Sequence, residues 1–175
     1  MQLTVFLKRY VKKTSGNFSK KITQIMIIGM GLLTSCVALG NPICGVVAVG
    51  PSAIYDSLGA NPADGVGNVE VSCTYVGLGS ATPAYQIQLS TGNSNNYDNR
   101  AMRLLGKSLI YNLYTNSSHS LVWGNGTGGT SVVTAAYSMT AGTEARNYPV
   151  YMRIPGAQLV NAGSYIDSIT VTITY

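Results

Sequence analysis

The chain has 175 residues and a formal charge of +5, a length that allows one domain once any leader is removed. The first 40 residues carry six of the basic side chains and no acid, whereas residues 41–175 contain five basic and six acidic residues and are formally −1. The remainder of the chain therefore lacks the basic surface that nucleic-acid binding needs, and we expect no nucleic-acid partner.

The first 40 residues follow the order of an export signal. Basic residues up to Lys21 precede an apolar run over residues 25–33, which has the length of a signal-peptide core and is short for a membrane span. Ala38 and Gly40 then supply small residues at the −3 and −1 positions of a cleavage site. We predict a signal peptide over residues 1–40 and one exported domain over residues 41–175.

Two other interpretations of this leader remain open. The sequence ending at Cys36 resembles a lipoprotein lipobox, which would lipidate that cysteine. An uncleaved anchor over residues 22–39 is the other alternative. All three interpretations place the domain outside the cytoplasm.

Cysteine content agrees with export. A cut after Gly40 leaves Cys44 and Cys73, and an even count in an oxidising compartment predicts one disulfide. Closing a loop of about 30 residues stabilises a small domain by roughly 3–4 kcal/mol. Metal binding is disfavoured, because the single histidine, His119, lies in a serine-rich turn and neither cysteine belongs to a C-x-x-C pair.

Apolar and polar residues alternate with period two in most of the remaining chain. No segment there has a sustained 3.6-residue apolar period, and β-branched and aromatic residues fill the alternating runs. Several short strands between polar turns predict an all-β sandwich. The predicted strands cover residues 69–75, 85–90, 109–114, 132–139, 148–154 and 169–175.

Motifs that could indicate catalysis are weak. Residues 124–129 match G-x-G-x-x-G, but strand-like residues follow where a dinucleotide site needs a helix, so we expect a loop. We expect His119 to be a solvated turn residue, and the scattered acids give no reason to select a catalytic pair. The sequence therefore predicts no enzyme, no catalytic or metal-binding residue and no cofactor.

Aromatic residues suggest a second possible function. Many of the twelve tyrosines occupy inward positions of the predicted strands, whereas Tyr97, Tyr114 and Tyr151 do not. With Trp123 they could form a stacking surface for sugars. A secreted carbohydrate-binding sandwich that belongs to no fibre is therefore the alternative function, and a small secreted hydrolase is a distant third.

Several blocks, read together, resemble one family. They include Gly-Asn-Val-Glu-Val-Ser-Cys-Thr at residues 67–74, Val-Trp-Gly-Asn-Gly-Thr-Gly-Gly-Thr at residues 122–130 and Gly-Ser-Tyr-Ile-Asp-Ser-Ile-Thr-Val-Thr-Ile-Thr-Tyr at residues 163–175. From Cys44 onward the chain resembles the spore coat protein U domain family, which includes the archaic, Csu-type chaperone–usher pilin subunits.

The resemblance implies an immunoglobulin-like β-sandwich that lacks its last strand. It implies a periplasmic chaperone, an outer-membrane usher and neighbouring subunits as partners, with transit through the periplasm to the cell surface, a fimbria or a coat. The final predicted strand would then provide the strand-acceptor edge. The residues that share its apolar face are Ile169, Val171, Ile173 and Tyr175.

One departure from the family concerns strand donation. Rod-forming members carry an alternating donor segment ahead of the first cysteine, but only residues 41–43 precede Cys44 after the predicted cut. A strand needs about five or six residues. The resemblance therefore implies a subunit that accepts a strand and does not give one, as at the tip of a fibre. The surface that it binds is not identified by the sequence.

Overall fold

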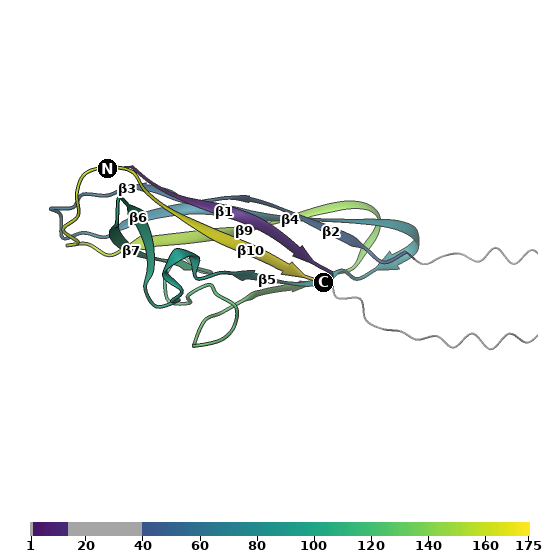
Figure 1. The fold of residues 1–175 in the computed structure, drawn as a ribbon. Helices are drawn as coiled ribbons and strands as arrows, with labels where there is room; N and C mark the ends of the chain where they lie inside the picture. Colours follow the sequence, from purple (N-terminus) through teal and green to yellow (C-terminus); the bar gives the residue numbers. More distant parts are fainter. Residues whose placement is uncertain (1, 14–39) are drawn as a thin grey trace, which may run out of the picture.

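The computed structural model describes residues 2–13 and 40–175 (Figure 1). The predicted signal-peptide core at residues 25–33 and the lipobox cysteine Cys36 lie outside the described residues. Apart from one 3-10 turn, η1, the described residues form strands and loops. The elements are β1 (Gln2–Lys12), β2 (Ile43–Val49), β3 (Ser52–Ile54), β4 (Ala63–Ala81), β5 (Ala84–Leu89), η1 (Gly92–Ser94), β6 (Arg100–Leu104), β7 (Lys107–Tyr114), β8 (Val133–Ala136), β9 (Met139–Ile154) and β10 (Tyr165–Thr174).

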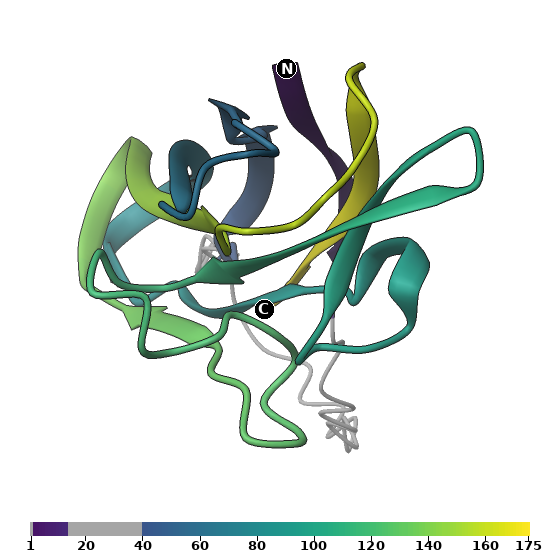
Figure 2. The ribbon, with the colours of Figure 1, turned by 90° about the vertical axis from the view of Figure 1, so that its left-hand side faces the viewer.

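The strands lie in two layers that face each other across one core (Figure 2). One layer has the order β2-β4-β9-β7, and the other contains β3, β1 and β10, with β5 and β6 paired to β10 and β8 to β5. Strand β7 pairs with both β9 and β6 and so joins the layers along one side. The predicted all-β, immunoglobulin-like sandwich is confirmed.

The period-two pattern fills the core as predicted. Odd-numbered residues of β4 from Val69 to Tyr75 are buried, as are Tyr85, Ile87 and Leu89 of β5. Alternate residues of β7, of β10 and of the last part of β9 (Val150, Met152 and Ile154) are buried too, because successive side chains of a strand point to opposite faces. The strand pattern therefore locates most of the core.

Strands β4 and β9 are longer than the sequence indicated. They form a long antiparallel pair from Ala63 opposite Ile154 to Ala81 opposite Met139. The predicted strand at 132–139 divides into β8 and the start of β9. One glycine permits part of the additional length of β4. A Cβ at Gly67 would lie 2.5 Å from the carbonyl oxygen of Val49, so the close approach of the chain there needs glycine.

A buried arginine anchors the side of β10 that faces β5 and β6. Arg100 is fully buried and donates hydrogen bonds to the carbonyl oxygens of Ser90 and Trp123 and to Oδ1 of Asn112, at 2.6–3.0 Å. Burial lowers the pKa of its guanidinium group. Because charged groups are costly to bury without partners, this network fixes the loop between β5 and β6.

A buried carboxylate continues this polar region on β10. Asp167 accepts hydrogen bonds from the hydroxyl group of Tyr111 at 2.7 Å and from the backbone N–H of Asn93 at 3.1 Å. Burial, together with the charge of Asp167, raises the pKa of Tyr111 above its ordinary range. These contacts bind β10 to β7 and η1.

Two expectations about loops have different outcomes. Residues 124–130 form a loop, as predicted, with no helix after it. His119 lies in a turn but is not solvated: its side chain is 9% exposed and makes edge contacts with the rings of Tyr114 and Tyr151. The serine-rich neighbours suggested solvent, whereas two tyrosines from different strands enclose the imidazole.

Candidate strand-acceptor groove

One edge of β10 is covered by a strand from the beginning of the chain. Strand β1 runs parallel to β10, from Leu3 opposite Tyr165 to Lys12 opposite Thr174, and Figure 1 shows the two side by side. Its first residues also pair with β3 in antiparallel register, from Gln2 opposite Ile54 to Thr4 opposite Ser52. Residues 2–12, which the sequence places in the leader, thus fill the groove between β10 and β3.

The first half of β1 is packed and the second half is open. Leu3 and Val5 are fully buried, and Leu7 packs against the core. Tyr10 and Val11 are exposed, and the Arg9 side chain reaches the carbonyl oxygen of Val46 at 3.4 Å. Apolar contact is therefore concentrated in a short alternating stretch at the start of the strand.

The predicted acceptor residues line this region in part. Ile169, Val171 and Ile173 are fully buried on the inward face of β10, and Tyr175, which follows β10, is half-buried. Ile169 lies opposite Leu7 of β1, whereas Val171 and Ile173 lie opposite Arg9 and Val11 and pair on their other side with β5. Their acceptor role stays a prediction. The residues that lie opposite Leu3 and Val5 are Tyr165 and Asp167, which sequence reasoning did not select.

The opposite wall of the groove comes from the connection between β2 and β3. The backbone N–H of Val5 donates a hydrogen bond of 3.0 Å to the carbonyl oxygen of Pro51. A Cβ built at Gly50 would lie 1.6 Å from the carbonyl oxygen of Val5, so any side chain there collides with the backbone of β1. Glycine at position 50 permits a strand to lie in the groove, which the sequence alone did not indicate.

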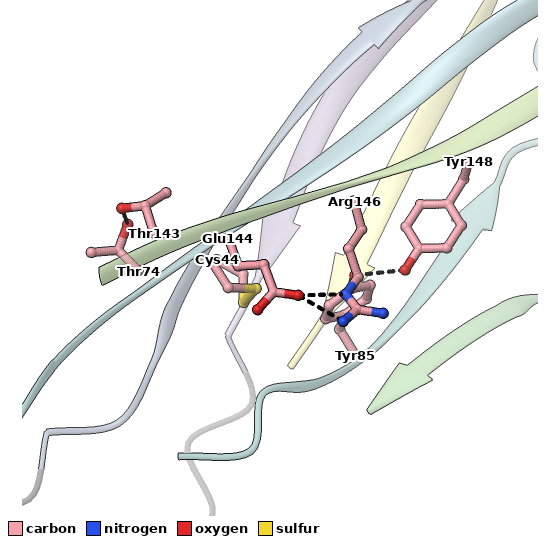
Figure 3. The surroundings of a disulfide bond; sticks show 8 residues. Cys44, Thr74, Tyr85, Thr143, Glu144, Arg146 and Tyr148 are labelled. Atoms are coloured by element: carbon pink, nitrogen blue, oxygen red, sulfur yellow. Dashed lines mark hydrogen bonds and ion pairs between the residues drawn. A yellow bond between two sulfur atoms is a disulfide. The ribbon is translucent and has the colours of Figure 1, made fainter. Parts of the chain in front are cut away.

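A disulfide supports this wall. Cys44 of β2 and Cys73 of β4 are opposite each other in register and are bridged, as predicted. Two hydrogen bonds lie nearby (Figure 3). The hydroxyl groups of Thr74 and Thr143, on the paired strands β4 and β9, are 2.8 Å apart. Those of Tyr85 on β5 and Tyr148 on β9 are 2.7 Å apart and link the two layers. The bridge ties β2, and with it the connection that contains Gly50, to the long β4–β9 pair.

The groove has an open end near this disulfide. A hollow of about 240 Å³ lies there, lined by residues that include Lys13, Cys44, Pro83 and Tyr175. It adjoins the loosely packed half of β1. The groove is thus tightly filled near Tyr165 and incompletely filled near Tyr175.

The aromatic residues considered for sugar stacking are already engaged within the protein. Trp123 is fully buried and donates its indole N–H to the carbonyl oxygen of Ile87 at 3.1 Å. Tyr97 donates to the carbonyl oxygen of Leu89, and Tyr114 and Tyr151 flank His119. These contacts favour a packing role for the four residues.

Neither a metal centre nor a spanning helix is found in the described part of the chain. In residues 2–13 and 40–175, His, Cys, Asp and Glu side chains form no group of three or more that could hold a metal ion. The same residues include no helix long and apolar enough to cross a membrane.

Comparison with protein families identifies the wider group. Residues 22–172 match the Spore Coat Protein U domain. The chain belongs to the Spore Coat Protein U domain family. The resemblance seen in the sequence is thereby confirmed over most of the chain.

The chain was also compared with solved structures and with curated proteins. One similar structure is a chaperone–tip adhesion subunit pre-assembly complex from the archaic chaperone–usher Csu pili of Acinetobacter baumannii, with 23% identity and a TM-score of 0.44. The match covers 77% of this chain and 40% of that one. No curated protein matches the chain significantly.

Proposed function

We propose that this protein is an exported structural and adhesive subunit of a surface pilus or coat, assembled by strand donation. In this proposal a periplasmic chaperone supplies a strand during transit, an outer-membrane usher exports the subunit, and a neighbouring subunit later supplies the strand. The observation that carries the proposal is the groove between β10 and β3, which holds an added strand beside β10. Membership of the Spore Coat Protein U domain family supports it.

The energetics of the groove favour a strand as its ligand. Without β1, one edge of β10 would present unpaired N–H and C=O groups, and the inward pockets that hold Leu3, Val5 and Leu7 would be empty. An added strand covers both, since backbone pairing gives affinity and alternate side chains give specificity. Each large apolar side chain buried in this way contributes roughly 1.5–3 kcal/mol, so three of them approach the whole stability of a small domain.

The adhesive part of the proposal rests on the end of the molecule that is far from the disulfide and the open end of the groove. At the end that faces the reader in Figure 2, several loops between strands come together. These loops adjoin each other, since the backbone N–H of Ala157 donates to the carbonyl oxygen of Gly59. At this end, β3 and three loops each carry one exposed large apolar side chain, and these side chains are the proposed contact surface. They are Ile54, Leu58, Leu105 and Leu159, exposed by 81%, 86%, 96% and 83%.

Glycine substitutions test strand acceptance. Residues 41–175 are exported to the periplasm together with a candidate periplasmic pilus chaperone, and the complex is purified through a tag on the chaperone. Gly50→Ala should reduce the recovered subunit at least about tenfold, because its Cβ occupies the place of a strand carbonyl group. The matched control is Gly45→Ala, whose Cβ meets nothing within 4 Å. Equal recovery of the two variants, or no complex with the unsubstituted subunit, would contradict the proposal.

Adhesion is tested separately from assembly. Cells that display the assembled subunit should lose attachment to an apolar surface when Leu58 and Leu159 are both replaced by Ser, while the amount of displayed subunit stays unchanged. A secreted sugar-binding sandwich predicts a different result. In that case the domain would be stable without a chaperone, and soluble sugars would change its tyrosine or tryptophan fluorescence.

A further inference from the structure

The only Asn-Gly pair of the sequence lies in the loop between β7 and β8. Asn125 and Gly126 belong to the glycine-rich block at residues 122–130, to which the proposed function gives no role. Both residues are exposed, whereas the preceding Gly124 is buried and its carbonyl oxygen accepts the backbone N–H of Leu89 at 3.1 Å. The pair is therefore open to water on a base that is fixed to β5.

Two donors polarise the side-chain carbonyl group of Asn125. Its Oδ1 accepts the backbone N–H of Thr127 at 3.1 Å and the hydroxyl group of the same residue at 2.7 Å. Donors placed at a carbonyl oxygen stabilise the negative charge that forms there when a nucleophile adds to the carbon. Within residues 2–13 and 40–175, the amide nitrogen Nδ2 of Asn125 has no hydrogen-bond partner, so the described part of the chain does not hold it back as a leaving group.

A nucleophile lies next to this carbonyl group in the chain. It is the backbone nitrogen of Gly126, whose N–H donates to Oγ1 of Thr130 at 3.1 Å, and that hydroxyl group donates onward to the carbonyl oxygen of Thr127 at 2.7 Å. Linked hydrogen bonds of this kind polarise one another and draw the proton away from the nitrogen. Gly126 has a φ of 84°, which favours glycine, and the absence of a side chain leaves its nitrogen unshielded.

We propose that Asn125 is a self-modification site, at which the folded loop promotes the loss of the side-chain amide group. The nitrogen of Gly126 bonds to Cγ of Asn125 and the bond from Cγ to Nδ2 breaks. The proton of the Gly126 nitrogen passes through water to Nδ2, which departs as ammonia and leaves a succinimide ring. One water molecule then opens the ring, to aspartate on one side or to isoaspartate on the other. The reaction needs water and no oxidant, reductant or cofactor.

The modification changes the charge of an exposed loop without a second protein. An aspartate at position 125 adds one negative charge and can still accept both hydrogen bonds from Thr127, so the loop keeps its shape. An isoaspartate lengthens the backbone and would disturb the turn that is closed by the N–H of Thr130 on the carbonyl oxygen of Thr127, at 3.1 Å. The loop thus carries an irreversible change of charge that advances with the age of the molecule.

The first experiment compares the full chain with a synthetic peptide of residues 121–131, which has the same sequence without the fold. Both are kept near neutral pH in water labelled with heavy oxygen, and peptide mapping follows the label at Asn125. The folded chain should react faster than the peptide, by about tenfold, because the fixed donors act only in the folded loop. Both aspartate and isoaspartate should form, as opening of a succinimide requires. A folded chain that reacts no faster than the peptide, or that yields aspartate alone, would overturn the proposal.

Asn116 provides a control within the same chain. It precedes a serine, its Nδ2 donates to the hydroxyl groups of Ser118 and Ser120 at 2.8 and 2.7 Å, and its Oδ1 accepts two backbone N–H groups. Its amide nitrogen is therefore held, and no glycine nitrogen follows it. Asn116 should keep its amide while Asn125 is labelled. Equal labelling at the two positions would contradict a role for the loop.

The second experiment changes the groups around Asn125 singly. Thr127→Val keeps the backbone donor but removes the hydroxyl donor, and Thr130→Val removes the acceptor of the Gly126 N–H; each should slow the reaction about threefold or more. Thr127→Ser, which keeps the hydroxyl group, should react at the original rate. The control variant is Thr134→Val, which changes an exposed residue of β8 outside the loop and should leave the rate unchanged. Unaltered rates in both Thr127→Val and Thr130→Val would show that the loop does not promote the reaction.

Discussion

The two edges of β10 are closed in different ways. Toward β5 and β6, β10 is held by antiparallel pairing and by buried polar contacts, in which Asp167 meets Tyr111 and Arg100 binds the adjoining loop. Toward β3, it is held by a parallel strand whose buried contacts are backbone pairs and a few apolar side chains. Buried polar networks demand one geometry, whereas alternating apolar side chains can be supplied by many sequences. We call the side of β10 toward β5 and β6 the fixed edge, because its polar contacts demand one partner. We call the side toward β3 the exchangeable edge, because strands of other sequences could replace β1 there.

Removal of the buried arginine should break the fixed edge. Arg100→Ala leaves the carbonyl oxygens of Ser90 and Trp123 without a donor and should lower the free energy of unfolding by about 4 kcal/mol. Urea unfolding of the full chain measures this. The matched control is Arg103→Ala on the same strand, where the exposed side chain bonds only Ser108, and a change below about 0.5 kcal/mol is expected there. Similar losses for the two variants would show that the buried network is not what holds this edge.

Loss of the disulfide should loosen the wall of the exchangeable edge. Replacing Cys44 and Cys73 together by Ala should cost about 3 kcal/mol, because the bridge closes a loop of 29 residues. The same urea experiment measures this loss. Addition of a reductant to the unsubstituted chain should lower its stability to a similar value and leave the double variant unaffected. If the urea midpoint of the unsubstituted chain stays the same in reductant, the bridge does not contribute to the stability of the fold.

Two leucines on opposite sides of β10 allow the fixed edge and the exchangeable edge to be compared directly. Leu89 and Leu3 are both buried, the first on β5 and the second on β1. Leu89→Ala should cost about 3 kcal/mol, whereas the cost of Leu3→Ala is limited to the free energy with which β1 docks. Hydrogen exchange should show faster exchange of β1 and β3 amides in Leu3→Ala, with the β5 amides unchanged. Equal acceleration of all these amides would mean that both edges open together.

The smallest effect concerns the hydroxyl group of Tyr111. Tyr111→Phe removes a hydrogen bond to buried Asp167 and should cost about 1–2 kcal/mol at neutral pH. Because burial raises the pKa of Tyr111, this tyrosine supports the fold fully below its ordinary value near 10, and that support declines as the pH rises beyond it. The difference between the unsubstituted chain and Tyr111→Phe should therefore narrow above pH 10. Urea midpoints from pH 7 to 11 measure it, and a difference that widens would contradict the assignment.

The sequence predicted the fixed edge better than the exchangeable one. Period-two alternation identified β5, β7 and β10, because each buries alternate side chains within one contiguous stretch of chain. The same alternation is present at Leu3, Val5 and Leu7, but the basic residues that follow favoured a leader over a strand. A segment can carry both signals at once, and only the three-dimensional pairing separates them.

Contacts between residues far apart along the chain also could not be predicted from the sequence. The role of Gly50 depends on a carbonyl group of β1 that is far away along the chain, and no local pattern marks it. The burial of Arg100 was not predicted, since nothing in its sequence neighbours reveals the carbonyl oxygens that surround it. The disulfide was predictable because the predicted cut after Gly40 leaves two of the three cysteines, and two cysteines have a single possible pairing.

The parallel register of β1 and β10 has a mechanical consequence. A strand that lies along β10 over the pairs from Leu3–Tyr165 to Lys12–Thr174 is loaded in shear when it is pulled along its own axis. All of its backbone hydrogen bonds then bear the force together, whereas a pull across the sheet would break them one after another. A subunit joined to its neighbour through this groove would resist a pull along a fibre. It would still release a strand that is pulled away from the sheet at the end near Thr174, where the strand makes few apolar contacts.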